Sequence, residues 1–411
     1  MVCILTRIPV KTITRFKSVC KPWYDLFSTS EFKKLHQAQF SSDPGNRSFI
    51  VHTFSGQYCS EPENQFSIFN IESVKKRPTI LDHPFDHAQK IELYTVGCCN
   101  GLVCIRRGQE IVLWNPAMKL SKTVPLRKLG PFEMMSLGFG YDAVGDDFKV
   151  VIFVESIVWG SIEGMELTSV EIYSANLDSW STVDVGFQFS GFKTKNKLIV
   201  NGNPYCDAIV EGNKVLLCFD VSELVFKIVP LPTIYMMGLD EEAEVDLNGL
   251  VEETGTVTET RTELFDLNGA VGAIVINYEV EYSVIGYSVH SSTIEYVWVF
   301  DDIEGIWRNN HTFGRIEVDV LVDRVLHCTK NEKILTLSSR KLLVLDLETG
   351  CAKDLIDGAR LCNYFGIYGY TESLASINGM EKVVLKNEQN GLDVCYEDDI
   401  GVFPVLSDTE W

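Results

Sequence analysis

The residues of this 411-residue chain that could do chemistry are few, and each group also has a plainer structural interpretation. His83 and His87 stand four positions apart, the spacing at which one helix face can offer two imidazoles to zinc. Pro84 lies between them, and proline in a helix interior breaks the helix. We therefore interpret residues 83–87 as a polar loop and expect no metal ligand there.

A second candidate is the pair Gly138 and Gly140, since glycine-rich loops can cradle phosphate. A dinucleotide-binding loop needs a third glycine and a place between a strand and a helix. This pair has neither, so we interpret it as part of a strand turn. The sequence contains no G-x-S-x-G motif, no Walker-type loop and no H-E-x-x-H motif.

Five aspartates could form an acid cluster of the kind that hydrolytic enzymes use. They are Asp142, Asp146, Asp147, Asp301 and Asp302. All adjoin predicted strand ends, where aspartate commonly stabilises a β-turn. We interpret them as turn residues and expect a chain with no catalytic residue, no metal and no cofactor.

The first forty residues carry a different signal, a stripe of apolar side chains at steps of three and four. The stripe consists of Ile13, Phe16, Cys20, Trp23 and Phe27. This spacing predicts helical structure with one apolar face. A unit of about 40 residues buries too little surface to be stable alone, so the stripe must pack on the following domain or on a partner.

Local start signals divide this region into two or three short helices. Pro9 suits a first helical turn, where its missing N–H is no loss. Ser28 and Glu31 have the spacing of a capping box at the start of the next helix.

The net charge of −21 argues against a general nucleic-acid binder and against binding to an anionic membrane. The charge is uneven, because residues 1–40 hold seven Lys or Arg and two Asp or Glu, a balance of +5 that leaves −26 for the remainder. A basic head on an acidic body favours an acidic partner for the head, and a solvated helix face explains the charge equally well. The longest strongly apolar runs, Val271–Ile276 and Tyr296–Phe300, are too short to span a bilayer.

The apolar run Met1–Leu5 is too short for a secretory signal, so we expect a cytoplasmic and/or nuclear protein. The twelve cysteines include no C-x-x-C pair and no zinc-like spacing. Cys98, Cys99 and Cys104 cluster within a predicted strand. We expect the cysteines to be reduced and to pack as small apolar residues.

After a polar linker at residues 41–47, short β-rich runs replace the helical periodicity. Examples are Ser48–Phe54, Gln65–Asn70, Leu102–Ile105, Glu110–Trp114 and Phe148–Val154. Asn-Gly, a strong hairpin signal, occurs at 100–101, 201–202, 248–249, 268–269, 378–379 and 390–391. We predict a mainly β body over residues 48–400, followed by a tail at 401–411.

A weak internal repeat refines the prediction. Two apolar residues followed by a small polar one recur at 68–70, 113–115, 172–174, 218–220, 299–301 and 344–346. Trp180, Phe226 and Trp307 follow the second apolar residue by seven positions, and a Lys or Arg follows it by eight positions in five of the six copies. Each copy therefore predicts a strand, a tight turn and a returning strand.

Most copies are spaced about 45 residues apart, which is the size of one four-stranded propeller blade. We predict a β-propeller of six or seven blades, closed by an early strand near Ser48–His52, with a pair of β-sandwich domains as the alternative. A gap of 81 residues between the fourth and fifth copies could hold a missed blade or an insertion. Residues 238–263 in that gap carry nine acidic residues and one Arg, and we interpret them as a mobile acidic insertion.

The first forty residues also resemble a known motif. Ile8-Pro9-Val10-Lys11, Arg15-Phe16-Lys17, Val19-Cys20-Lys21 and Trp23 are similar to the second half of a plant F-box. That motif commonly opens with a Leu-Pro pair and most of a helix about ten residues upstream of Ile8, so we expect a partial F-box module over residues 1–40.

The body resembles the F-box-associated domain of the same plant family. The matching phrases are 96–104 (VGCCNGLVC), 113–116 (LWNP), 138–142 (GFGYD), 147–151 (DFKVV), 170–174 (VEIYS), 178–180 (DSW), 219–221 (FDV), 231–232 (LP) and 297–301 (VWVFD). They cover most of the chain in family order. The chain has no Gly-Gly doublet and no Trp-Asp pair, so it matches neither the kelch nor the WD-repeat signature strictly.

The resemblance implies a substrate-recognition subunit of an SCF-type (Skp–cullin–F-box) ubiquitin ligase, which is not itself an enzyme. Its head would bind a Skp-family adaptor, and through it a cullin, while its propeller would bind a target protein that the sequence does not indicate. The implied adaptor-binding residues are Ile4, Leu5, Ile8, Pro9, Val10, Ile13, Phe16, Val19, Cys20 and Trp23.

Two alternatives remain open. The first is a propeller interaction module that does not bind an adaptor, because the opening half of the F-box is not present in the sequence. The second, less favoured, is a carbohydrate-acting propeller enzyme that uses the five aspartates in a central channel.

Overall fold

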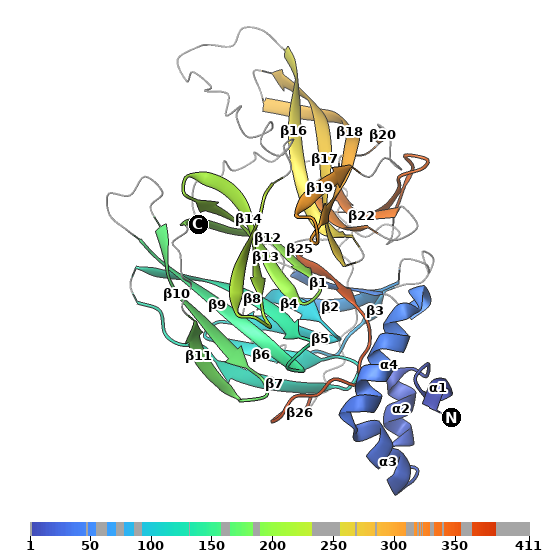
Figure 1. Ribbon diagram of the computed structural model, residues 1–411. Helices are drawn as coiled ribbons and strands as arrows, with labels where there is room; N and C mark the ends of the chain where they lie inside the picture. Colours follow the sequence, from blue (N-terminus) through green and yellow to red (C-terminus); the bar gives the residue numbers. More distant parts are fainter. Residues whose placement is uncertain are drawn as a thin grey trace.

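The structure is a computed structural model of the chain (Figure 1). It describes residues 2–46, 48–54, 64–70, 78–85, 93–130, 132–157, 165–183, 190–231, 255–267, 269–283, 286–309, 316–318, 320, 322, 324–328, 333–338, 341–354 and 364–383. The predicted tail at 401–411 and most of the predicted insertion, 238–254, lie outside these residues.

Four helices form a compact unit, here called the head, at the amino end of the chain. They are α1 (Val2–Leu5), α2 (Val10–Phe16), α3 (Lys21–Ser28) and α4 (Ser30–Ser42), followed by the 3-10 turn η1 (Pro44–Asn46). The head therefore has more helices than the two or three that we predicted, and α4 extends two residues past the predicted boundary at 40. None of the described helices is both long and apolar enough to cross a membrane.

The described strands form a six-bladed β-propeller, as the repeat predicted. Blade 1 contains β25 (Tyr364–Tyr370), β1 (Ser48–Phe54), β2 (Asn64–Phe69) and β3 (Thr79–Ile80); blade 2 contains β4 (Leu93–Cys99), β5 (Leu102–Arg107), β6 (Glu110–Asn115) and β7 (Leu120–Pro125), with β26 (Glu381–Lys382) added to its outer edge. Blade 3 contains β8 (Glu133–Asp142), β9 (Asp147–Ile157), β10 (Met165–Ser174) and β11 (Ser179–Val183).

The second half of the propeller continues the same up-and-down order. Blade 4 contains β12 (Ser190–Val200), β13 (Asn203–Val210), β14 (Asn213–Asp220) and β15 (Val225–Val229). Blade 5 contains β16 (Gly255–Leu267), β17 (Ala270–Ser283), β18 (Gly286–Asp301) and β19 (Ile306–Asn309), with β20 (Ile316–Val318) beside β18; blade 6 contains β21 (Arg324–Cys328), β22 (Lys333–Ser338), β23 (Lys341–Asp346) and β24 (Ala352–Asp354).

The six copies of the repeat correspond to the six blades. Each copy lies at the end of the third strand of its blade, on β2, β6, β10, β14, β18 and β23. The 81-residue gap therefore hides no further blade in the described residues. The prediction of an acidic loop over 238–263 is wrong for its last nine residues, because β16 begins at Gly255 and pairs with β17 along its whole length.

The aromatic residue that follows the repeat by seven positions lies directly opposite it on the fourth strand. Tyr173 is the cross-strand partner of Trp180, and their ring centroids are 5.4 Å apart. The equivalent pairs, Phe219 with Phe226 and Phe300 with Trp307, have centroids 5.0 Å and 5.4 Å apart. Cross-strand aromatic pairs of this kind stabilise a hairpin, which explains the spacing.

The propeller closes as predicted, by antiparallel pairing of β1 with β25. Ser48 lies opposite Tyr370, and Ile50 lies opposite Tyr368. Blade 1 thus takes one strand from the carboxyl half of the chain and three from the amino half.

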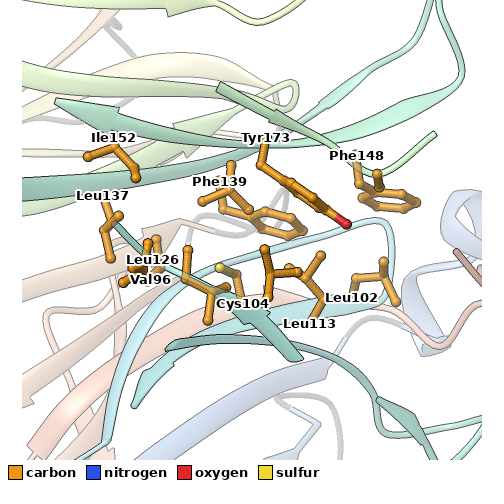
Figure 2. Packing of buried hydrophobic residues seen from close by; sticks show 14 of the residues in the cluster. Val96, Leu102, Cys104, Leu113, Leu126, Leu137, Phe139, Phe148, Ile152 and Tyr173 are labelled. Carbon is orange, nitrogen blue, oxygen red and sulfur yellow. The ribbon is translucent and has the colours of Figure 1, made fainter. Parts of the chain in front are cut away.

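Neighbouring blades pack through apolar cores. Figure 2 shows the core between blades 2 and 3, where Leu102, Cys104 and Leu113 face Leu137, Phe139 and Tyr173. All six side chains are at most 8% exposed. A sheet buried on both faces explains why the strand phrases read as continuous apolar runs rather than as an alternating pattern.

The pair Gly138 and Gly140 lies within strand β8, where it allows blade 4 to approach. A side chain at Gly140 would collide with the carbonyl oxygen of Gly202, and one at Gly138 would press on Pro204. The backbone N–H of Tyr141 donates to Gly202 at 3.1 Å. These glycines are therefore packing residues.

A buried ion pair connects the same two blades. Lys149 donates to Asp142 at 2.8 Å and to the carbonyl of Val221 at 2.7 Å, and Ser222 also donates to Asp142 at 2.7 Å. The side chains of Asp142 and Lys149 are only 8% and 11% exposed. Burial opposes ionisation of Asp142, but the N–H of Gly145 together with Lys149 and Ser222 outweighs it and holds the pKa of Asp142 far below its usual range.

We predict that Asp142→Asn destabilises the propeller by about 3 kcal/mol, because it leaves the buried ammonium of Lys149 without a charged partner. Chemical denaturation followed by tryptophan fluorescence measures the loss. Asp301→Asn is the matched control, since Asp301 forms the equivalent pair with Arg308 on the exposed surface and its loss should change stability little. Equal losses in both variants would contradict a special role for burial.

A second buried polar group lies between blades 1 and 2. The ring of His52 is 1% exposed, with Asn64 at 3.1 Å from Nε2 and Thr95 at 3.1 Å from Nδ1. Burial lowers the pKa of His52 to about 4, with a smaller lowering from His83 and an opposing effect of the bond to Asn64.

We predict that stability falls as the pH is lowered from 6.5 to 4, because in this window the unfolded chain binds a proton at His52 that the folded chain does not. The pKa difference corresponds to about 3 kcal/mol at pH 4. Thermal unfolding across this pH range should show a shallower slope for His52→Gln. Gln109→Asn, at an exposed turn, should keep the full slope, and a variant slope equal to that of the parent chain would refute the assignment.

Candidate protein-interaction surface

The helices of the head begin where local chemistry favours them. Pro9 is the N-cap of α2, and Pro22 lies in the first turn of α3, where neither needs to donate a hydrogen bond. The cap of α4 is Thr29, whose hydroxyl accepts from the N–H of Phe32 at 3.2 Å. The prediction that Ser28 caps this helix is wrong, because Ser28 ends α3 and donates to the carbonyl of Tyr24 at 2.6 Å.

The head has a small apolar core of its own. Five of its side chains are buried together with Leu374, which the propeller contributes; they are Leu5, Val10, Ile13, Phe27 and Phe32. Aromatic rings extend this core along the helices: the ring centroid of Trp23 lies 5.1 Å from that of Phe16 and 5.9 Å from that of Phe27. The predicted stripe is therefore real, but part of it faces inward.

Burial divides the ten residues that the resemblance implied for adaptor binding. Leu5, Val10 and Ile13 are buried at 6%, 0% and 0% exposure, so they support the head from within and present no surface to a partner in this arrangement. The half-buried members are Ile8, Phe16 and Trp23, and the exposed ones are Ile4, Pro9, Val19 and Cys20. Cys20 is the N-cap of α3 and has an extended backbone, so it lies outside both helices and the stripe is interrupted there.

Sequence reasoning missed two exposed apolar residues of the head. Tyr24 on α3 is 56% exposed and Leu35 on α4 is 49% exposed. Both helices carry apolar residues on more than one side, and the local sequence pattern does not indicate which side faces the propeller. With Ile4 at 71% and Val19 at 64%, they leave the head with four large exposed apolar side chains among the described residues.

The propeller positions the head through the segment that follows β25. The side-chain amide of Asn115, which is fully buried, donates from Nδ2 to the carbonyls of Ser373 and Ala375 at 3.1 and 2.7 Å. Its Oδ1 accepts from the N–H of Met118 at 3.0 Å. This fixes Leu374 against the head core, next to Met118. Figure 1 shows the helices beside this end of the propeller, next to the strand β26.

Polar contacts also attach the head to the propeller. Asp146, in the β8–β9 turn, accepts from Ser30 at 2.9 Å and from Lys34 at 3.0 Å, while Lys33 donates to Ser376 at 2.9 Å. Burial opposes ionisation of Asp146, but the bonds from Tyr141, Lys34 and Ser30 outweigh it and lower its pKa. The helix α4 thus holds a basic side toward an acidic turn of blade 3.

The remaining chemical candidates have structural roles. Asp142 accepts from the N–H groups of Val144 and Gly145, and Asp301 accepts from those of Ile303 and Glu304, as predicted for turn residues. His83, the first of the two histidines, is buried and lies 3.1 Å from the carbonyl of Asn64; His87 lies outside the described residues. The described residues contain no group of three or more His, Cys, Asp or Glu placed to hold a metal ion.

The cysteines described in the structure are free, among them Cys98, Cys99 and Cys104 on β4 and β5. Burial raises the pKa of the Cys99 thiol to about 12, and the pKa of Cys98 is raised in the same way with a further contribution from Cys99. These three act as packing residues in strands, as predicted.

Comparison with known proteins gives an independent result. The family described as "F-box associated beta propeller domain" matches residues 59–255. An F-box protein of Arabidopsis thaliana is 26% identical over 243 residues, which cover 57% of this chain and 60% of that protein. An F-box/kelch-repeat protein of the same plant is 28% identical over 260 residues, which cover 60% of this chain and 68% of that protein.

The match to the first of these relatives therefore spans about three fifths of the relative's length. Among solved structures, a functionally unknown protein from Desulfotomaculum acetoxidans is similar with a TM-score of 0.38 and 12% sequence identity. The superposition covers 80% of this chain and all of that protein, and at this TM-score it carries no argument. The family match begins after the head. Residues 59–255 are thus similar to the F-box associated β-propeller domain, and the two relatives are F-box proteins of a plant.

Proposed function

We propose that the chain is the substrate-recognition subunit of an SCF-type ubiquitin ligase, acting in the cytoplasm and/or nucleus. The head binds a Skp-family adaptor and through it a cullin, and the propeller binds a target protein. Another subunit transfers ubiquitin, so the chain contributes by positioning and none of its residues needs to react.

The observation that carries this proposal is the unpartnered apolar surface of the head. Ile4, Val19, Tyr24 and Leu35 are between 49% and 71% exposed on a unit of only 45 described residues. A few apolar anchors at the centre of an interface supply most of its affinity. The proposed adaptor-facing set is Ile4, Ile8, Pro9, Phe16, Val19, Cys20, Trp23, Tyr24 and Leu35.

The charge of the head agrees with an acidic partner. Arg7, Lys11, Arg15 and Lys21 are exposed, whereas Lys34 is paired with Asp146. Opposite charge on the partner would accelerate association and favour the correct orientation. The acidic propeller would repel the same partner, which directs it to the helices.

A second candidate function is a propeller interaction module that does not bind an adaptor. The burial of Leu5, Val10 and Ile13 favours it, because three of the ten residues that the F-box resemblance implied are used to build the head. The experiment below separates the two functions.

We predict that Val19→Asp combined with Tyr24→Ala weakens binding to a Skp-type adaptor by about tenfold or more, since it removes two apolar contacts and places a carboxylate against an acidic partner. The full chain, with and without the substitutions, is immobilised, and binding of purified plant Skp-type adaptor is measured by biolayer interferometry.

Met134→Asp is the matched control, because Met134 is 53% exposed on β8, in the propeller, and should not touch the adaptor. Adaptor binding that is unchanged by the head substitutions would contradict the proposed surface. No adaptor binding by the parent chain would favour the second candidate function.

We further predict that Asn115→Ala loosens the head and lowers stability by about 2 kcal/mol, because it leaves the carbonyls of Ser373 and Ala375 without their donor. Hydrogen–deuterium exchange of residues 2–46 should increase, and denaturation should show the loss. Asn213→Ala, at the exposed first residue of β14, is the control that should change neither. Unchanged exchange in the head of the Asn115 variant would show that the head is held by its apolar contacts alone.

A further inference from the structure

The three most exposed large apolar side chains of the described residues all lie at turn tips of the propeller. Ile303 is 92% exposed, Val144 is 89% exposed and Leu177 is 76% exposed. Ile303 follows β18, the third strand of blade 5, and Leu177 follows β10, the third strand of blade 3. Val144 follows β8, the first strand of blade 3. In an antiparallel blade the first and third turns lie at the same end, so these tips share the end on which the head sits.

The three turns that carry these tips, together with the β14–β15 turn of blade 4, form one surface, here called the tip surface. It consists of residues 142–147, 174–178, 220–224 and 301–305. Asn176 donates to the carbonyls of Gly145 and Asp146 at 3.4 and 3.0 Å, which holds the turn of Leu177 against the turn of Val144. Ser222 donates to Asp142, which joins the turn of blade 4.

The turn of blade 5 continues the surface. Tyr205 of blade 4, whose cross-strand partner Cys218 lies just before the β14–β15 turn, packs in the same apolar cluster as Phe300 and Trp307 of blade 5. Phe300 and Trp307 flank the turn that carries Ile303. The hairpin that carries Ile303 therefore packs against blade 4. Scattered single apolar residues are ordinary on a protein surface, but these three lie at one end of the propeller, on blades 3 and 5 with blade 4 between them, and they point to an interaction site.

The charge of the tip surface indicates its partner. Its four turns contain no Lys and no Arg, and their nine acidic residues are Asp142, Asp146, Asp147, Asp178, Asp220, Glu223, Asp301, Asp302 and Glu304. The basic residues that pair with them come from neighbouring strands and from the head: Lys122, Lys149, Lys227, Arg308 and Lys34. Nine acids against five bases leave the surface acidic.

The head shows how this surface engages a basic element. The helix α4 rests on the edge of the tip surface with Ser30 and Lys34 on Asp146. Beyond that contact the tips at Val144, Leu177 and Ile303 stay open. An occupant of the open part would continue an interface that the chain already forms with its own basic helix.

We propose that the tip surface docks a basic segment of a partner protein, with aliphatic side chains of that segment packing on the three tips. Opposite charge brings the segment to the turns, and apolar contact fixes its place. Nucleic acid and anionic membranes carry the wrong charge, and a second copy of this chain has a net charge of −21. The inference goes beyond adaptor binding and does not rest on it, because the head is not part of the proposed contact.

The test uses the full chain and three labelled helical peptides about four turns long, whose apolar and polar positions follow the same pattern. One combines Lys with Leu, one combines Glu with Leu, and one combines Lys with Ser. Fluorescence anisotropy should show the Lys/Leu peptide binding about tenfold more tightly than either of the others. Leu177→Lys and Ile303→Lys should each weaken it about tenfold, and higher salt should weaken it further.

Phe132→Lys is the matched control, since Phe132 is 54% exposed just before β8, at the end of blade 3 opposite the β8–β9 turn, and should leave binding unchanged. Equal binding of the Lys/Leu and Lys/Ser peptides would overturn the role of the tips. Binding unaffected by both tip substitutions would overturn the location. Self-association seen by light scattering and abolished by the tip substitutions, without peptide binding, would assign the surface to a second copy instead; adaptor capture by the head is measured separately and is independent of each outcome.

Discussion

The antiparallel pairing of β1 with β25 is the interaction on which the arrangement of this molecule depends. Because Ser48 lies opposite Tyr370, the chain that precedes β1 and the chain that follows β25 leave the sheet at the same end. The preceding chain is the head, and the following chain carries Leu374 into the head core. Closure of the ring therefore removes sheet edges and also brings the head together with the segment that packs against it.

The attachment of the head to the propeller depends on groups that lie far apart in the sequence. Asn115 bonds to Ser373 and Ala375, which follow it by more than 250 residues. It belongs to the phrase LWNP, whose Trp114 is fully buried in the core between blades 1 and 2. One short phrase thus serves both the packing of a blade and the attachment of the head.

Much of the fold could be predicted from the sequence because it depends on interactions between residues close together in the chain. The spacing of Tyr173 to Trp180 and of Phe300 to Trp307 records a cross-strand pair, and repetition of that pair gives the blade. The positive φ angles of Asn100 and Gly101, and again of Asn201 and Gly202, are those that an Asn-Gly hairpin turn requires.

What could not be predicted depends on contacts between distant segments. The helical stripe of the head was visible, but that Ile13 faces inward while Val19 faces outward is decided by Leu374 and Met118, more than 95 residues away. In the same way, nothing local distinguishes Asp142, buried on Lys149, from Asp301, exposed on Arg308. The same residue type in the same kind of turn thus forms a buried ion pair in one blade and a surface ion pair in another.

The opposite charges of the head and the propeller end lead to one further consequence for how partners are arranged. An acidic partner is attracted to the exposed cations of the head and repelled by the turns of blades 3 to 5, and a basic partner experiences the reverse. Since Lys34 and Asp146 neutralise each other where the two surfaces meet, the boundary between them is fixed by an ion pair within the chain. Partners of opposite charge at these two surfaces would therefore bind side by side, and the buried contacts of Leu374 and Asn115 support the relative position of the two surfaces.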